Sequence, residues 1–180
     1  RPLAYHVHPY RWATIGKEIK HIEDATMEDV KAFFHRFYLP SNAIMVVAGN
    51  VKHDDVKRLA EKWFAPIPSG KRPERKTIVE PEQTEPRRST VHRDVPSDAI
   101  HKVYHMAARM DKEYHAQDLL SDVLGRGQSS RFYNALVKDR QLFTDLSAHV
   151  SGSFEKGLFV ISGRLRNGVK PEEAEAGIQS

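Results

Sequence analysis

Histidine pairs are the first residues in this sequence that could do chemistry. His101 and His105 occur four residues apart in "HKVYH". On a helix this spacing puts both imidazoles on one face, where they can bind zinc. The stretch is β-branched and aromatic, however, and predicts a strand, in which the two residues lie about 13 Å apart. Tyr104 also occupies the position where a metallopeptidase would carry its glutamate base. We therefore expect no zinc site here.

A second pair, His6 and His8 in "HVH", has better geometry, because alternate residues of a strand share a face. No third ligand follows at a fixed spacing, so we expect an exposed polar segment instead of a metal site. The sequence also lacks a nucleophile elbow, a Ser/His/Asp order and a helical His-x-x-Glu-His motif. No catalytic residue and no metal ligand is therefore assigned within these 180 residues.

The segment "GRGQSSRFYNALVKDRQLFT", residues 125–144, raises the possibility of a phosphate site at a helix N-terminus. A phosphate loop requires G-x-x-x-x-G-K-[ST], and a dinucleotide fold requires G-x-G-x-x-G after a strand. Here the glycines follow a predicted helix. We expect Gly125 to be the C′ glycine that ends this helix, and Ser129 or Ser130 to cap the next one. The pattern favours a tight helix–turn–helix.

The elements that must position these residues fall into two groups. The first group has a helix from Thr26 to Pro40, a strand over residues 42–51 and a helix from Asp54 to Pro66. Residues 66–88, with five prolines and many charges, are the best linker candidate. The second group is listed in chain order: strands over 89–96 and 99–110, a helix over 112–124, a hairpin of 145–154 and 157–165, and a helix that begins near Pro171.

This order predicts an α+β fold with antiparallel sheets and helices packed on one face, in two incomplete, similar lobes. The helix over 112–124 has an apolar stripe on one face; it comprises Ala116, Leu119, Leu120, Val123 and Leu124. The helix near Pro171 shows no apolar face, and residues 1–25 are irregular. We therefore expect the chain to be a piece of a longer protein.

Composition excludes several classes of protein. The chain has no cysteine, which rules out disulfides and cysteine-ligated metal. Its longest apolar run is far shorter than the roughly 20 residues that cross a bilayer, so no transmembrane segment is expected. The formal net charge is +4, but 28 basic residues alternate with 24 acidic ones. A basic nucleic-acid-binding module is therefore an alternative that we do not favour.

Several stretches, in order, resemble the pitrilysin/insulinase family of zinc metallopeptidases, of the two-subunit bacterial and mitochondrial-processing type. They are "HPYRWATIG" (residues 8–16), "IEDATMEDVKAFFHRFYLPSNAIMVVAGNV" (22–51), "VKRLAEKWFAPIPSG" (56–70) and "DLLSDVLGRGQSSRFYNALV" (118–137). The resemblance implies that residues 1–68 end a first, zinc-bearing domain. Residues 69–88 would then be a linker, and residues 89–180 would begin a second, non-catalytic domain.

The resemblance also implies how the full-length protein works. Zinc would be bound by an inverted His-x-x-Glu-His motif, which would lie before residue 1, and none is expected on this fragment. Peptide or protein substrates would be cleaved in a closed chamber. His8, Tyr10, Arg131 and Tyr133 match family segments and are candidates for chamber or structural residues. For Arg131 and Tyr133 we expect packing and turn hydrogen bonds, without a catalytic role.

One departure from the family pattern is informative. The family's partner half continues S-R-L-Y with an L-R…Y segment, whose arginine and tyrosine reach the substrate carbonyl. Here these two positions are Val137 and Thr144. Valine has no donor for a developing oxyanion. We therefore interpret the full-length protein as the zinc-bearing subunit, with a sister subunit that supplies the arginine and the tyrosine.

Two questions stay open at this point. A non-catalytic assembly subunit of the same family is the main alternative, and a His-x-x-Glu-His motif upstream of Arg1 would decide between the two. The compartment also stays open, since the periplasm suits a bacterial member and the mitochondrial matrix a eukaryotic one.

Overall fold

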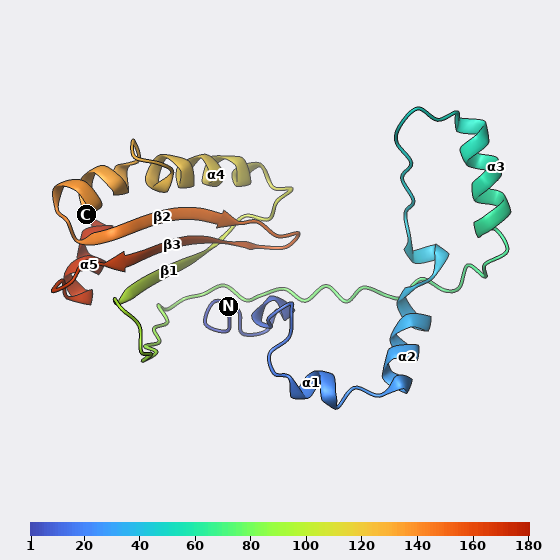
Figure 1. The fold of residues 1–180 in the computed structure, drawn as a ribbon, viewed down its shortest axis with the longest axis horizontal. Coiled ribbons are helices and arrows are strands. Elements are labelled where there is room, and N and C mark those ends of the chain that lie inside the picture. The colour runs from blue at the N-terminus through green and yellow to red at the C-terminus, as the bar shows by residue number, and fades with distance from the viewer. The chain divides into compact units, whose positions relative to one another are not determined.

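The computed structural model describes all 180 residues, which divide into two compact units (Figure 1). Unit 1 combines residues 1–11 with residues 80–180, and unit 2 comprises residues 12–79. The boundaries expected at residues 68 and 88 stay a prediction. No helix combines the length and the apolar character that crossing a membrane requires.

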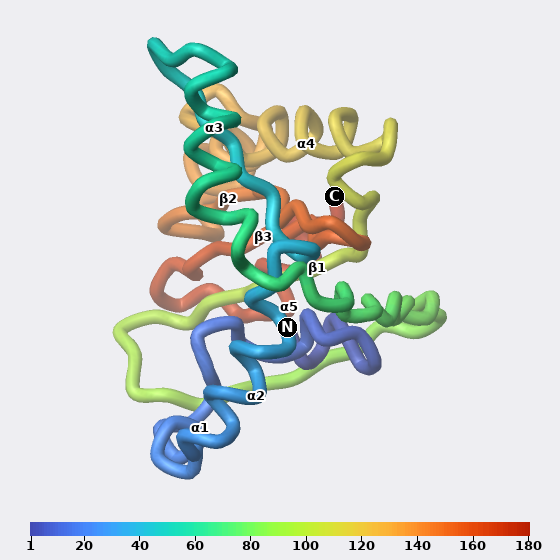
Figure 2. Tube along the Cα trace, turned by 90° about the vertical axis from the view of Figure 1, so that its right-hand side faces the viewer, coloured from blue at the N-terminus to red at the C-terminus, as the bar shows by residue number.

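Unit 1 is built on a three-stranded antiparallel sheet of β1 (Ala99–Met106), β2 (Phe143–Ser151) and β3 (Gly157–Leu165). The spatial order is β1-β3-β2, so β3 is central (Figure 2). Val103 pairs with Val160 on one side of β3, and Ser147 pairs with Ser162 on the other. The predicted hairpin of β2 and β3 is confirmed, and an irregularity interrupts its register after Phe143.

Helices pack on one face of this sheet. They are α4 (Lys112–Gly125), a π-helix (Tyr133–Asp139) and α5 (Pro171–Gln179), which begins at the predicted proline. The core between the helices and the sheet contains Phe143, 1% exposed, and Leu165, 2% exposed. Figure 1 shows α4 along one side of the sheet and residues 1–11 on the other. The predicted α+β class, with helices on one face of an antiparallel sheet, is confirmed.

The face of α4 that packs on the sheet is not its apolar stripe, of which Leu124 alone packs against the core. Leu119, Leu120 and Val123 are exposed, whereas Ser121 is buried. The cause is a close approach between α4 and β2: a Cβ on Gly125 would lie 1.9 Å from the backbone nitrogen of Ala148. Small residues permit this approach, and the larger side chains of Leu119 and Leu120 point away from the sheet.

The prediction that Gly125 is the C′ glycine after α4 is wrong. It is the last residue of the helix and is not a left-handed C′ residue. The left-handed glycine of this turn is Gly127, with φ of +73°. Ser130 does cap the next helical segment, since its Oγ accepts a hydrogen bond from the Tyr133 amide at 3.4 Å. The glycines of residues 125–144 therefore serve packing and chain reversal.

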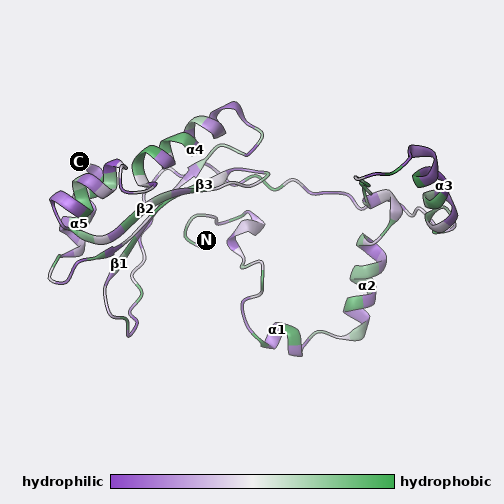
Figure 3. Cartoon of the chain, turned by 45° about the horizontal axis from the view of Figure 1, so that its top comes forward, coloured by the Kyte–Doolittle hydropathy of each residue, from purple (hydrophilic) through white to green (hydrophobic).

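Unit 2 contains α1 (Lys20–Glu23), α2 (Met27–Phe37) and α3 (His53–Phe64). The two longer helices are the two predicted from the apolar pattern. A capping box begins α2: the Thr26 side chain accepts from the Asp29 amide, and the Asp29 carboxylate accepts from the Thr26 amide. None of the unit's helices contains a buried residue. Figure 3 shows hydrophobic and hydrophilic residues side by side on α2 and α3.

Two predicted strands are wrong. Residues 42–51 and residues 89–96 form no strand in the structure. A β-branched run becomes a strand only when a neighbouring strand accepts its hydrogen bonds. Within this chain no strand pairs with either segment, and Ile44 and Val46 are almost fully exposed.

Candidate functional site

The segment that contains His8 and Tyr10 is fixed to unit 1 by a buried carboxylate. Glu80, 5% exposed, accepts three main-chain hydrogen bonds. The His6 amide donates to Oε1 at 2.7 Å, and the amides of Val7 and His8 donate to Oε2 at 2.9 and 2.8 Å. We call this arrangement of Glu80 and residues 6–8 the Glu80 clasp. It joins positions more than 70 residues apart in the sequence.

Aromatic rings pack around the clasp. Tyr5 is buried, and its hydroxyl donates to the Lys156 carbonyl at 2.9 Å. The His8 and Tyr10 rings lie 4.1 Å apart, and the Tyr10 amide donates to His8 Nδ1 at 3.1 Å. His8 is 7% exposed, so the prediction of an exposed segment is wrong for this residue. The reason is that residues 1–11 cover the end of the sheet instead of extending into solvent.

The same contacts shift two pKa values. Burial raises the pKa of Glu80, but the amides of His6, His8 and Val7, together with nearby His105, outweigh burial and lower it to about 2. For Tyr5, burial and then neighbouring Tyr10 raise the pKa to about 12. Glu80 is therefore a carboxylate and Tyr5 a neutral phenol at neutral pH. Neither of these two groups titrates near pH 7, so neither can act as a general acid or base there, and both serve to hold the chain.

The structure places His101 and His105 in β1, as predicted, and gives each ring a different partner. His101 Nδ1 lies 2.8 Å from Ser162 Oγ, and His105 Nε2 lies 2.7 Å from the Ala4 carbonyl oxygen. The described residues contain no group of three or more His, Cys, Asp or Glu side chains that could hold a metal ion. The donor set of this fragment therefore does not fit a zinc ion.

In residues 125–144, the two positions that depart from the family pattern have different surroundings. Val137 lies in the π-helix, half-buried against the core of unit 1. Thr144 is exposed on β2, and its Oγ1 lies 3.3 Å from the Arg164 carbonyl. Arg131 is exposed and Tyr133 half-buried at the start of the same helical segment. Val137 thus lies against the core of unit 1, whereas Thr144 lies at its surface.

Two residues that sequence reasoning missed stand out in the structure. Glu80 lies in the predicted linker, where its neighbours Val79 and Pro81 give no sign of burial. Gln141 has φ of +54°, a left-handed conformation that favours glycine. It sits at the turn between the π-helix and β2, and Arg166 bonds its side chain. No periodicity or motif in the sequence could have marked either residue.

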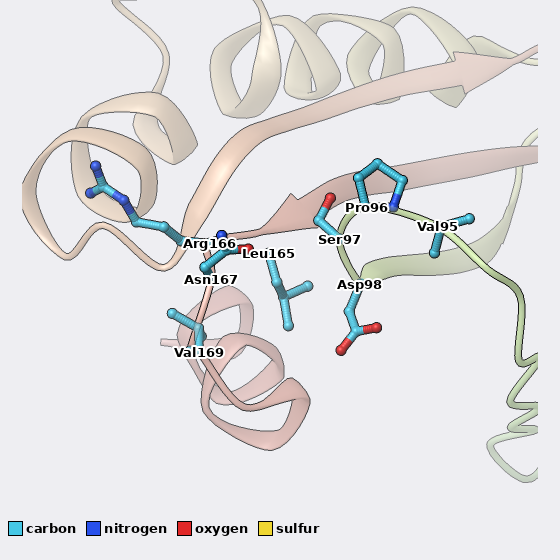
Figure 4. A pocket seen from close by; sticks show the side chains of 9 residues that line it. Val95, Pro96, Ser97, Asp98, Leu165, Arg166, Asn167 and Val169 are labelled. Carbon is cyan, nitrogen blue, oxygen red and sulfur yellow. The ribbon is translucent and has the colours of Figure 1, made fainter.

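A surface hollow of about 220 Å³ lies where β1 begins and β3 ends. Its polar side chains include Asp98 and Arg166, and Figure 4 shows Arg166 pointing away from Asp98. The hollow therefore lacks the convergent polar groups of a ligand site.

Comparison with known proteins places this architecture in a family. Residues 24–180 match the family described as the peptidase M16 inactive domain. Zinc protease PqqE of Helicobacter pylori is 32% identical over 175 residues, which are 94% of this chain and 38% of that protein. An uncharacterized zinc protease of Streptomyces coelicolor is 26% identical over 152 residues, 78% of this chain and 32% of that protein.

Solved structures agree with the sequence comparison. The crystal structure of a Helicobacter pylori protease superposes with a TM-score of 0.75 at 30% identity, over 97% of this chain and 43% of that one. The peptidase M16 inactive domain of Pseudomonas fluorescens has the same fold, with a TM-score of 0.71 at 24% identity, over 98% and 41%. The chain thus spans less than half the length of these proteins. On this evidence the chain belongs to the M16, or pitrilysin-like, peptidase family and carries its inactive domain.

Proposed function

We propose that this chain is a supporting part of a zinc-dependent endopeptidase whose metal is bound by polypeptide outside these 180 residues. The observation that carries the proposal is the match of the inactive-domain family to residues 24–180, in relatives that are named zinc proteases. The chain supplies structure to the enzyme: a packed sheet and the Glu80 clasp in unit 1, and two amphipathic helices in unit 2.

The full-length protein is the zinc-bearing subunit, and a sister subunit supplies the arginine and tyrosine that contact the substrate carbonyl. The surroundings of Val137 and Thr144 support this assignment. Val137 has no polar group and packs against the core, while the hydroxyl of Thr144 lies beside the Arg164 carbonyl and the Asp145 carboxylate. Peptide substrates are held in a chamber closed by the two subunits.

Unit 2 fits the same proposal. Its helices carry large apolar side chains at the surface, including Phe33, 58% exposed, and Trp63, 64% exposed. Such a surface marks an interaction site when the residues are contiguous. In the full-length enzyme, we assign these helices to the zinc-bearing domain, where further polypeptide covers their apolar faces.

The test compares three proteins on one fluorescent peptide substrate: the 180-residue chain, the full-length protein, and the full-length protein mixed with its sister subunit. Zinc content is measured by mass spectrometry for each. The expected result is zinc in both samples that contain the full-length protein and none in the 180-residue chain, with peptide cleavage in the mixture only. Zinc-dependent cleavage by the 180-residue chain contradicts the proposal.

A double substitution, Val137→Arg with Thr144→Tyr in the full-length protein, tests the role of the sister subunit. The partner should still be required, because residue 137 faces the core of unit 1, whereas residue 144 lies at its surface. A full-length protein that contains zinc but cleaves nothing with any partner supports the alternative, a non-catalytic assembly subunit.

A further inference from the structure

We propose that the Glu80 clasp is a conformational device that holds both chain connections to unit 2 at one place on unit 1. Unit 2 comprises the 68 residues from 12 through 79. Glu80 directly follows unit 2, and the amides that it binds belong to residues 6–8, shortly before unit 2 begins. Unit 2 is therefore a closed loop inserted into unit 1. This inference concerns these 180 residues alone and does not depend on the proposed function.

The chemistry of the clasp makes Glu80 hard to replace. Both carboxylate oxygens accept hydrogen bonds: Oε1 from the amide of His6, Oε2 from the amides of Val7 and His8. A buried charge is tolerated only when such bonds compensate its loss of hydration. Glutamine has one oxygen and one NH₂ group, and the NH₂ group cannot accept from an amide. Glu80→Gln therefore loses the bond to His6 or the two bonds to Val7 and His8.

The other hydrogen bonds described between residues 1–11 and the rest of unit 1 lie on either side of the clasp. Before it, His105 bonds the Ala4 carbonyl and Tyr5 donates to the Lys156 carbonyl. After it, the Tyr10 hydroxyl accepts a long hydrogen bond of 3.4 Å from the Glu155 amide. Only Glu80 fixes the amides of residues 6–8. Loss of its carboxylate should free this stretch, and the connection that follows it, while the sheet stays folded.

Hydrogen exchange of individual amides in the whole 180-residue chain tests the proposal. Glu80→Ala should speed the exchange of the His6, Val7 and His8 amides by about 10- to 100-fold, the range that follows from losing charged hydrogen bonds. The amides of β3, such as those of Val160 and Ile161, should exchange as in the unmodified chain. Cleavage by trypsin after Arg11 should accelerate in parallel.

The matched control is Glu82→Ala, because Glu82 is an exposed glutamate two residues along the same segment. It should leave the exchange at residues 6–8 unchanged. Glu80→Gln keeps the side-chain volume, so the same exchange measurement can be made on it if Glu80→Ala does not fold. The proposal is overturned if residues 6–8 remain protected in both Glu80 variants. It is also overturned if β3 loses protection to the same extent, because Glu80 would then support the whole of unit 1.

Discussion

The two units show that the same sequence pattern has different outcomes with and without a packing partner. Both units contain helices with an apolar stripe. In unit 1, helices and a sheet enclose a core of buried side chains that includes Phe143 and Leu165. In unit 2, α2 and α3 have strong stripes and yet bury no residue. Periodicity therefore identifies a helix and its apolar side, while burial depends on which surface packs against it, as the exposed Leu119 and Leu120 of α4 also show.

The largest expected difference between the units is the loss of stability when one phenylalanine ring is removed from each. Phe143→Ala should lower the free energy of unfolding by about 3–5 kcal/mol, because it empties a packed core. Phe33→Ala in α2 should change it by no more than about 0.5 kcal/mol, because Phe33 is exposed. Urea unfolding followed by far-ultraviolet circular dichroism measures both values.

The tryptophans provide an independent check on this contrast. Both tryptophans of the chain, Trp12 and Trp63, lie in unit 2, and each is 64% exposed. Their emission should resemble that of solvent-exposed tryptophan before urea is added. If tryptophan emission shifted cooperatively at the same urea concentration as the circular dichroism signal, unit 2 would have a core like that of unit 1, and the difference between the units would be contradicted.

A smaller effect is expected at the contact between α4 and β2. Gly125→Ala places a Cβ against the backbone of Ala148 and should cost about 1–3 kcal/mol through displacement of the helix. Gly127→Ala is the control in the same turn, since it meets no atom within 4 Å and pays only for its positive φ, about 1 kcal/mol. Equal losses in the two variants would show that α4 does not depend on this close approach.

Acid should weaken the clasp. Glu80 has a folded-state pKa of about 2, below its ordinary value of 4.5. A lowered pKa stabilises the fold at every pH above 4.5, and this contribution is lost as the pH falls from 4.5 through 2. The difference in unfolding free energy between the unmodified chain and Glu80→Ala should therefore be constant at neutral pH and shrink in acid. A difference that does not change down to pH 2 would argue against this pKa shift.

The smallest changes concern single backbone positions, one in each unit. Gln141→Gly in unit 1 should raise the free energy of unfolding by up to about 1 kcal/mol, because glycine adopts φ of +54° without strain. Thr26→Ala in unit 2 removes the capping box of α2, which is worth about 1 kcal/mol to that helix. We expect it to reduce helical content while the urea midpoint of unit 1 stays the same.

Sequence patterns predicted several helices and the hairpin correctly, but they did not predict which helix faces would be buried. The capped helix after Thr26, the hairpin of β2 and β3 and the helix at Pro171 depend on local patterns, and the structure has all three. The orientation of α4 depends on how closely it approaches β2. Gly125 permits the close approach and Ser121 is buried, whereas the apolar pattern emphasises the exposed Leu119 and Leu120, so the pattern does not identify the buried face.

The candidate site shows the same limit. The β-branched neighbours of His101 and His105 predicted a strand, and both residues do lie in β1. Their rings have different partners there. The clasp could not be found in this way, because its donors are main-chain amides. Every residue except proline has such a donor, and nothing in "HVH" distinguishes the three that bind Glu80.

The clasp also affects the order in which the chain can fold during synthesis. Residues 1–11 leave the ribosome long before Glu80, His105 and Lys156, to which they bind. At about 5–20 residues per second, roughly 7 to 30 seconds pass between the addition of Arg11 and that of Lys156. Throughout that interval the rings of Tyr5 and His8 lack the surface that buries them, so residues 1–11 can dock only after Lys156 has been made.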